Sequence, residues 1–156
     1  MKYRMLNNEE LISLEEDLKA FLIVNGIDGS TWENINKTKP EKAIELVEMF
    51  SDLVLQKVYE KLEYLEHRTE LSCIAHKFSK HKIEGITIVS NDSLTCNLSS
   101  PESLHEALTK HSDKLTFYKG EKNIESTKEE EIHRCIENGF HISHREFWDA
   151  LERMVL

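Results

Sequence analysis

Two Glu-x-x-His pairs are the first residues whose types and spacing could do chemistry: Glu102 with His105, and Glu130 with His133. On a helix, this spacing puts a carboxylate and an imidazole on one face, as in the di-iron proteins built on four-helix bundles. Such a site needs further glutamates from two more long helices. Both glutamates also stand three residues after a small polar residue, so we interpret them as capping residues at helix starts.

A second group combines the side-chain types that bind zinc, namely His133, Cys135, His141 and His144. Their order matches no common zinc-finger spacing, and the chain has no Cys-x-x-Cys pair. We therefore interpret them as surface or helix-end residues and predict no cofactor. A metal-binding protein or hydrolase that uses this group is kept as an alternative.

The cysteines give no sign of a catalytic nucleophile. Cys73 and Cys96 lie in apolar, strand-like runs, which is typical of buried free thiols in a reducing compartment. The chain also lacks a Gly-x-Ser-x-Gly elbow and a glycine-rich phosphate loop. The sequence therefore favours a protein that is not an enzyme, although a Cys–His pair that meets only in the folded chain stays open.

One pattern recurs six times: a small polar residue followed three positions later by glutamate, the signature of a helix N-terminus. The six pairs are Asn7/Glu10, Ser30/Glu33, Thr38/Glu41, Ser99/Glu102, Thr127/Glu130 and Ser143/Glu146. Together with apolar residues at helical spacing, they predict helices over 7–24, 30–36, 38 to about 68, from Ser99 or Ser100 to about 111, over 127–138, and from 143 onward.

The helix predicted from Thr38 is the longest, about 28 residues and roughly 40 Å. Its apolar residues form a face so broad that it must be covered on more than one side, by the first helix and by the sheet or a partner chain. Its opposite face is acidic. The last two residues, His67 and Arg68, would complement the negative end of the helix dipole.

After Thr69 the apolar period changes from 3.6 to 2, which indicates strands. Residues 71–78 and 83–89 are predicted to form a hairpin whose turn is basic. A third strand is expected at Leu94, Cys96 and Leu98, and a short fourth one over 114–119.

This order of elements predicts an α+β fold. It consists of an N-terminal helical hairpin with one long helix, a small, mostly antiparallel sheet of three or four strands, and C-terminal helices. We predict a single domain over 1–156. Its parts are a helical part (1–69), a sheet with one helix (70–120) and a helical C-terminal part (121–156).

Composition and charge restrict the possible partners. The chain has 156 residues, 31% of them charged, and a net charge of −9. So acidic a chain is poorly suited to nucleic acid, where neutralising phosphates supplies much of the affinity, but it suits a protein with a basic face. No signal peptide is recognisable, and apolar runs such as 20–24 are too short to cross a bilayer, so we expect a cytoplasmic protein without membrane insertion.

Several short segments together resemble a family of small bacterial cytoplasmic proteins with no assigned function. They are residues 1–4, the surroundings of Trp32, residues 50–52 and 64–67, and residues 137–139 ahead of Phe147. The resemblance covers nearly the whole chain and implies no catalytic residues.

The leading hypothesis is a non-enzymatic protein-interaction module, an adaptor or a subunit of a larger bacterial assembly, that binds a protein partner or a second copy of itself. An acidic inhibitor or immunity-type protein that blocks a basic partner is the alternative. The predicted contact residues are Glu45, Glu48, Asp52, Glu63, Glu66, His67, Arg68, Lys80, His81 and Lys82.

Overall fold

The computed structural model describes residues 1–155, which fold into helices and one antiparallel sheet. The helices are α1 (Asn8–Ser13), α2 (Glu15–Val24), α3 (Gly29–Thr38), α4 (Pro40–Glu60), α5 (Pro101–Lys110), η1 (Ser112–Lys114), α6 (Lys128–Glu137) and α7 (Arg145–Val155). The strands are β1 (Tyr64–Arg68), β2 (Ser72–Phe78), β3 (Lys82–Ser90), β4 (Leu115–Asn123) and β5 (His141–Ile142). The chain forms two compact units, Met1–Val58 and the part from Tyr59 onward.

The predicted first helix is two helices, so the prediction of one helix over 7–24 is wrong. Leu14 leaves helical geometry (φ −107°, ψ 20°) and separates α1 from α2. The three acidic residues that follow it lie in the first turn of α2, where the helix dipole favours negative charge. The start of α1 is as predicted: Asn7 Oδ1 accepts from Glu10 N–H at 2.8 Å, and Glu10 Oε1 accepts from Asn7 N–H at 3.0 Å.

Among the other predicted caps, Thr127 is correct, because its hydroxyl accepts from the N–H of Glu130. At α5 the cap is Ser100, one of the two serines predicted to open that helix. The observed caps differ at α3, which has Asp28 instead of Ser30, and at α7, which has His144 instead of Ser143. Thr38 is the last residue of α3, and its hydroxyl donates to a carbonyl one turn earlier. Neighbouring polar residues compete for each cap, and spacing alone does not decide between them.

The N-terminal segment is hydrogen-bonded along α4. The carboxylate of Asp52 accepts from the backbone N–H of Lys2 at 2.6 Å and of Tyr3 at 2.9 Å. Further along, the fully buried hydroxyl of Ser51 accepts from the N–H of Leu6 at 3.1 Å. Asp52 was predicted to contact a partner. In the structure its carboxylate instead binds the N-terminal backbone of the first unit.

Helix α4 buries a narrower apolar face than its sequence suggests. The buried hydrophobic residues along it are Ala43, Leu46, Phe50, Leu55 and Tyr59. Leu53 and Val58, which the helical spacing also places on the apolar face, keep 44% and 42% of their surface exposed. Part of the predicted face is therefore left uncovered.

Strand β1 replaces the end of the predicted long helix, so the prediction that this helix runs to about residue 68 is wrong. The helix ends at Glu60, and Tyr64–Arg68 pairs antiparallel with Cys73–Lys77 of β2. On its other side β1 pairs with β5. Both edges of β1 thus have backbone partners, and Leu65 is fully buried, which outweighs the local helical pattern.

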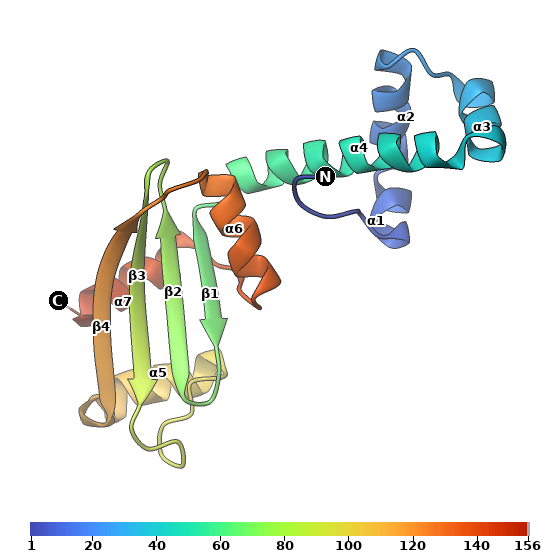
Figure 1. The fold of residues 1–156 in the computed structure, drawn as a ribbon. Helices are drawn as coiled ribbons and strands as arrows, with labels where there is room; N and C mark the ends of the chain where they lie inside the picture. The colour runs from blue at the N-terminus through green and yellow to red at the C-terminus, as the bar shows by residue number, and fades with distance from the viewer. Residues whose placement is uncertain (156) are drawn as a thin grey trace. The chain divides into compact units, whose positions relative to one another are not determined.

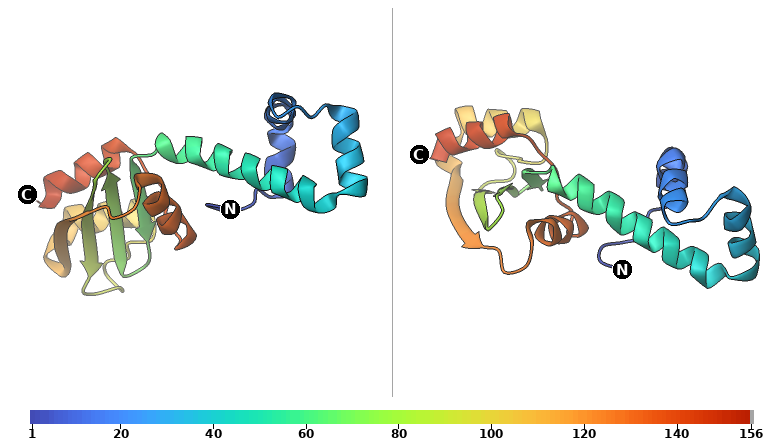
Figure 2. Two further views of the ribbon diagram at one scale, coloured as in Figure 1. Left: turned by 45° about the horizontal axis from the view of Figure 1, so that its top comes forward. Right: turned by 90° about the horizontal axis from the view of Figure 1, so that it is seen from above.

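The sheet has the strand order β4-β3-β2-β1-β5, with every neighbouring pair antiparallel. Figures 1 and 2 show α5 and α7 on one face of the sheet and α6 on the other. The α5/α7 side holds the main core, including Trp148, Ile86 and Ile88. The α+β class is confirmed, with five strands.

Two details of the predicted sheet differ. The segment expected as a third strand forms none, although Cys96 and Leu98 are fully buried. The spacing of Cys96 and Leu98 resembles that of a strand because both side chains are buried, although the segment is a connection and not a strand. Within this connection, Leu98 N–H donates to the carbonyl of Glu70 at 3.0 Å. Strand β4, in contrast, extends to Asn123 and pairs along its whole length with β3.

Asp52→Ala tests how the N-terminal segment is held. It removes a charged acceptor of two backbone N–H groups, so we expect it to destabilise the first unit by about 1–3 kcal/mol. Hydrogen exchange of the Lys2 and Tyr3 amides should become faster. Glu45→Ala is the control, because within residues 1–155 Glu45 makes an exposed pair with Lys42 and no other ion pair. Equal effects of the two substitutions would contradict the assignment.

Glu10 gives a pH-dependent test. The hydrogen bonds from Arg4, at 2.8 and 3.0 Å, and then the one from the Asn7 backbone lower the pKa of Glu10 from 4.5 to about 2. A lowered pKa stabilises the fold above pH 4.5, and this contribution is lost as the pH falls toward 2. Denaturant unfolding of Glu10→Gln should show reduced stability at pH 7 and a difference from the unsubstituted protein that vanishes near pH 2. A difference independent of pH would refute the linkage.

Candidate functional site

The ten residues predicted to contact a partner do not gather on one surface. Glu45, Glu48 and Asp52 lie on α4 in the first unit, and the other seven lie in the second unit. Among these three predicted residues, Asp52 binds the N-terminal backbone and Glu45 lies 3.9 Å from the ammonium of Lys42. The acidic face is thus partly engaged within the unit.

A hollow of about 740 Å³ collects three of the predicted residues, Glu63, Lys80 and His81, at one end of the sheet. Lys128 of α6 also lines it. Charges of both signs are therefore mixed in this hollow. Lys82 lies outside its lining, and its ammonium is 3.4 Å from a carboxylate oxygen of Glu121 on β4.

The three predicted residues on β1 are divided between the two faces of the sheet, because successive side chains of a strand alternate. Glu66 and Arg68 point to the α5/α7 side and form an ion pair, with Arg68 Nη2 3.0 Å from Glu66 Oε2. His67 points to the α6 side, where its Nδ1 lies 3.0 Å from the carbonyl oxygen of Gly139. The predicted helix end would have kept Glu66, His67 and Arg68 together at one end of the helix.

The four residues considered for zinc have different surroundings. His133 Nδ1 lies 2.9 Å from the hydroxyl of Tyr59, whereas His141 and His144 are exposed. Cys135 faces the sheet. Within residues 1–155, no group of three or more His, Cys, Asp or Glu side chains is placed to hold a metal ion.

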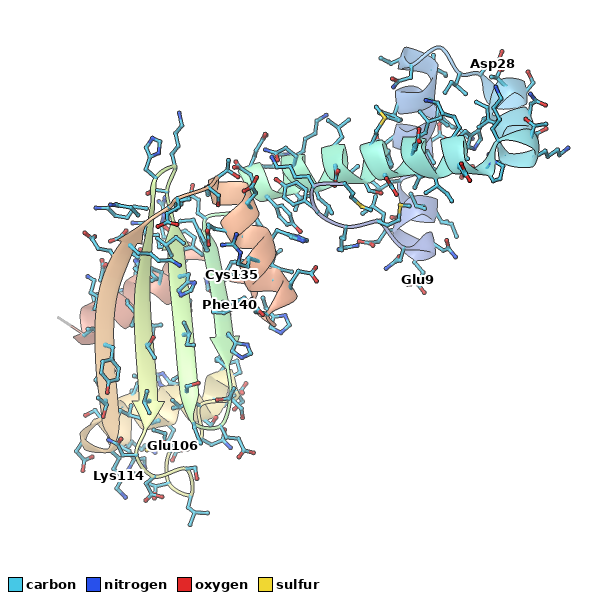
Figure 3. All side chains as sticks on the ribbon, viewed as in Figure 1. Glu9, Asp28, Glu106, Lys114, Cys135 and Phe140 are labelled. Atoms are coloured by element: carbon cyan, nitrogen blue, oxygen red, sulfur yellow. The ribbon has the colours of Figure 1, made fainter. Side chains whose placement is uncertain are left out.

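A Cys–His pair does form in the folded chain, between Cys135 of α6 and His76 of β2. The Cys135 sulfur lies 3.8 Å from His76 Nδ1, and the imidazole stacks on Phe140 with ring centroids 4.8 Å apart. Cys135 and Phe140 are labelled in Figure 3. Burial, and then the charge of Glu131, raises the pKa of the Cys135 thiol. Burial, and then the charge of Lys122, lowers the pKa of His76. Both groups are therefore neutral at pH 7, which is unlike a thiolate–imidazolium nucleophile.

The groove between α2 and α4 in the first unit contains none of the predicted contact residues, although the broad apolar face predicted for the long helix indicated an uncovered surface there. It has a volume of about 470 Å³, and its lining residues are Leu14, Asp17, Ala20, Phe21, Val24, Phe50, Leu53, Val54, Lys57 and Val58. The rings of Phe21 and Phe50 meet there with centroids 5.5 Å apart. To predict this groove, one would need to know which aliphatic side chains stay exposed after folding, and this follows from the structure alone.

Comparison with known proteins places the chain in a family. One family model matches residues 1–156. The chain belongs to the DUF6495 family. This is a family of unknown function, as the resemblance implied. No curated protein and no solved structure matches the chain. Bacterial origin and cytoplasmic location stay predictions for this DUF6495 member.

None of the helices within residues 1–155 combines the length and the apolar character that crossing a membrane requires.

Cys135 provides a test of the neutral Cys–His pair. Because burial raises the pKa of its thiol, we expect slow modification by a thiol reagent at pH 7, with a rate that climbs only toward alkaline pH. His76→Ala should not slow the reaction. Mass spectrometry of peptides resolves this site from the buried Cys73 and Cys96. Rapid labelling at pH 7 that is lost in His76→Ala would identify an activated thiol and contradict this assignment.

Proposed function

We propose that this protein is a non-enzymatic protein-binding module, and that its first unit takes an amphipathic helix of a partner protein into the α2–α4 groove. The observation that carries the proposal is the exposure of large aliphatic side chains in that groove. Val24 is 86% exposed, and Leu53 and Val58 are 44% and 42% exposed. Contiguous exposed apolar surface of this kind is typical of interaction sites.

The shape of the groove suits a helix. The lining residues from α2 are spaced by three and four and lie on one face of that helix: Asp17, Ala20, Phe21 and Val24. The facing residues come from α4. Figure 1 shows that α2 crosses α4, and apolar side chains of both helices line the groove at this crossing. A helix of a partner protein can lay residues spaced by three and four against such a surface.

The charge of the first unit favours a basic partner. Residues 1–58 contain eleven Asp and Glu and seven Lys and Arg, a net charge of −4. Three of the acidic residues, Glu15, Glu16 and Asp17, form the first turn of α2, and Asp17 lines the groove itself. We therefore expect the bound helix to carry Lys or Arg beside its apolar face, which would also speed association.

A second copy of this chain is a less suitable occupant because the whole chain has a net charge of −9. Like charges of this size oppose self-association. The alternative of an acidic inhibitor draws its support from the same negative charge. It differs in expecting the acidic face of α4 to make the contact, whereas we place the contact in the apolar groove.

Site-specific photocrosslinking tests the proposal. A photoreactive residue at Val24 should crosslink a partner protein in native lysate, and peptide mapping should place the crosslink in an amphipathic segment rich in Lys or Arg. Leu53→Glu puts a charge into the groove at a position that is already half exposed, so the fold should persist. Affinity for the partner should fall at least tenfold, about 1.4 kcal/mol.

The matched control is a photoreactive residue at Glu33, an exposed position on α3 outside the groove lining. Equal crosslinking at both positions, or none at Val24, would refute the proposal. Crosslinks only to the chain itself, together with a dimer by light scattering that Leu53→Glu dissociates, would replace the partner helix with a second copy.

A further inference from the structure

A separate cavity in the second unit lies between β1 and the helices α5 and α7. Its volume is about 270 Å³. The helix side of its wall is apolar and includes Leu104, Leu108, Phe147 and Leu151. The strand side presents the charged groups of Glu66 and Arg68, and the exposed His105 and His144 also line it.

The two charged groups are buried for residues of their type. The side chain of Glu66 is 14% exposed and that of Arg68 is 20% exposed. They share a face because they stand two residues apart on β1. The guanidinium of Arg68 also lies over the ring of Phe147, 5.3 Å from its centroid. Pairing with β2 fixes the backbone of both residues, and the contact with Phe147 of α7 holds the Arg68 guanidinium.

Neither group has its hydrogen-bonding capacity filled. Glu66 Oε2 is buried and accepts no hydrogen bond among residues 1–155, although Arg68 Nη2 lies 3.0 Å away. A guanidinium has five N–H donors. Within residues 1–155, the Arg68 guanidinium makes the ion pair with Glu66 and the contact with the Phe147 ring. Buried polar groups are normally satisfied, so the cavity offers both an unmet acceptor and unmet donors.

We propose that this cavity binds a small zwitterion with an apolar side chain, a free apolar α-amino acid. Its carboxylate would contact the Arg68 guanidinium, and its ammonium would contact the Glu66 carboxylate. Each charge of the ligand would then face a group of opposite charge. The apolar side chain would lie against Leu108 and Phe147.

Three features select this ligand. The guanidinium matches a carboxylate, which can accept two parallel hydrogen bonds. The lone pair on Glu66 needs a donor, which an ammonium supplies and a simple carboxylic acid does not. Drug-sized ligands occupy pockets of roughly 300–1,000 Å³, so this cavity of about 270 Å³ admits a smaller molecule.

Calorimetric titration of the full chain with leucine is the direct test. We expect saturable one-to-one binding with a dissociation constant that is roughly millimolar or tighter. N-acetyl-leucine lacks the ammonium and leucinamide lacks the carboxylate, so each should bind at least about tenfold more weakly. Lysine should also bind more weakly than leucine, because the helix side of the cavity is apolar. These comparisons use the unsubstituted protein and do not depend on whether a variant folds.

Variants then locate the site. Glu66→Gln keeps the shape of the side chain and should reduce leucine affinity at least tenfold. Ala150→Leu should do the same by filling the cavity from α7. Glu106→Gln is the control, since Glu106 is an exposed residue of α5 outside the lining, labelled in Figure 3. The proposal is overturned if leucine does not bind, if N-acetyl-leucine or leucinamide binds as tightly, or if Glu66→Gln and Glu106→Gln behave alike.

Discussion

The pairing of β1 with β2 and β5 is the constraint on which the second unit depends. All five residues, Tyr64–Arg68, pair with β2, and Leu65 and Glu66 also pair with β5, so this register supplies partners for backbone groups on both edges of β1. Because side chains alternate along a strand, the register also decides which side chain meets which helix. Leu65 and His67 face α6, whereas Glu66 and Arg68 face the cavity under α5 and α7. A shift by one residue would bury His67 in that cavity and turn the ion pair toward α6.

The two units meet the cost of burying polar groups in different ways. In the first unit, the carboxylate of Asp52 accepts two backbone N–H groups and so holds the N-terminal segment on α4. In the second unit, Glu66 and Arg68 neutralise each other but leave donors and an acceptor unused. A buried ion pair adds little stability by itself. Asp52 is therefore explained by the fold, whereas the unused groups of the pair on β1 are the basis of the proposed ligand site.

Local sequence signals predicted the elements whose stability is local. The caps at Asn7 and Thr127 and the hairpin of β2 and β3 belong to this class. Where a long-range contact decides the structure, the same signals failed. Residues 64–68 continue a helical pattern until pairing with β2 overrides it, and Cys96 alternates like a strand residue while lying in an unpaired segment. The candidate sites were predicted only in part. Glu66 and Arg68 were chosen for position at a helix end, but the cavity beside them and the exposed α2–α4 groove depend on tertiary packing that spacing does not encode.

The structure depends most on residues 61–68 leaving the helix, with Tyr64–Arg68 forming a strand. Nuclear Overhauser effects between backbone protons test this conformation most directly. Pairing of β1 with β2 predicts cross-strand contacts between residues 64–68 and 73–77, with Glu66 opposite Ala75, and an end of the helical pattern at Glu60. Contacts between residues three apart that continue from Glu60 through Arg68 would show a helix instead. That result would contradict the division of Glu66, His67 and Arg68 between the two faces of the sheet.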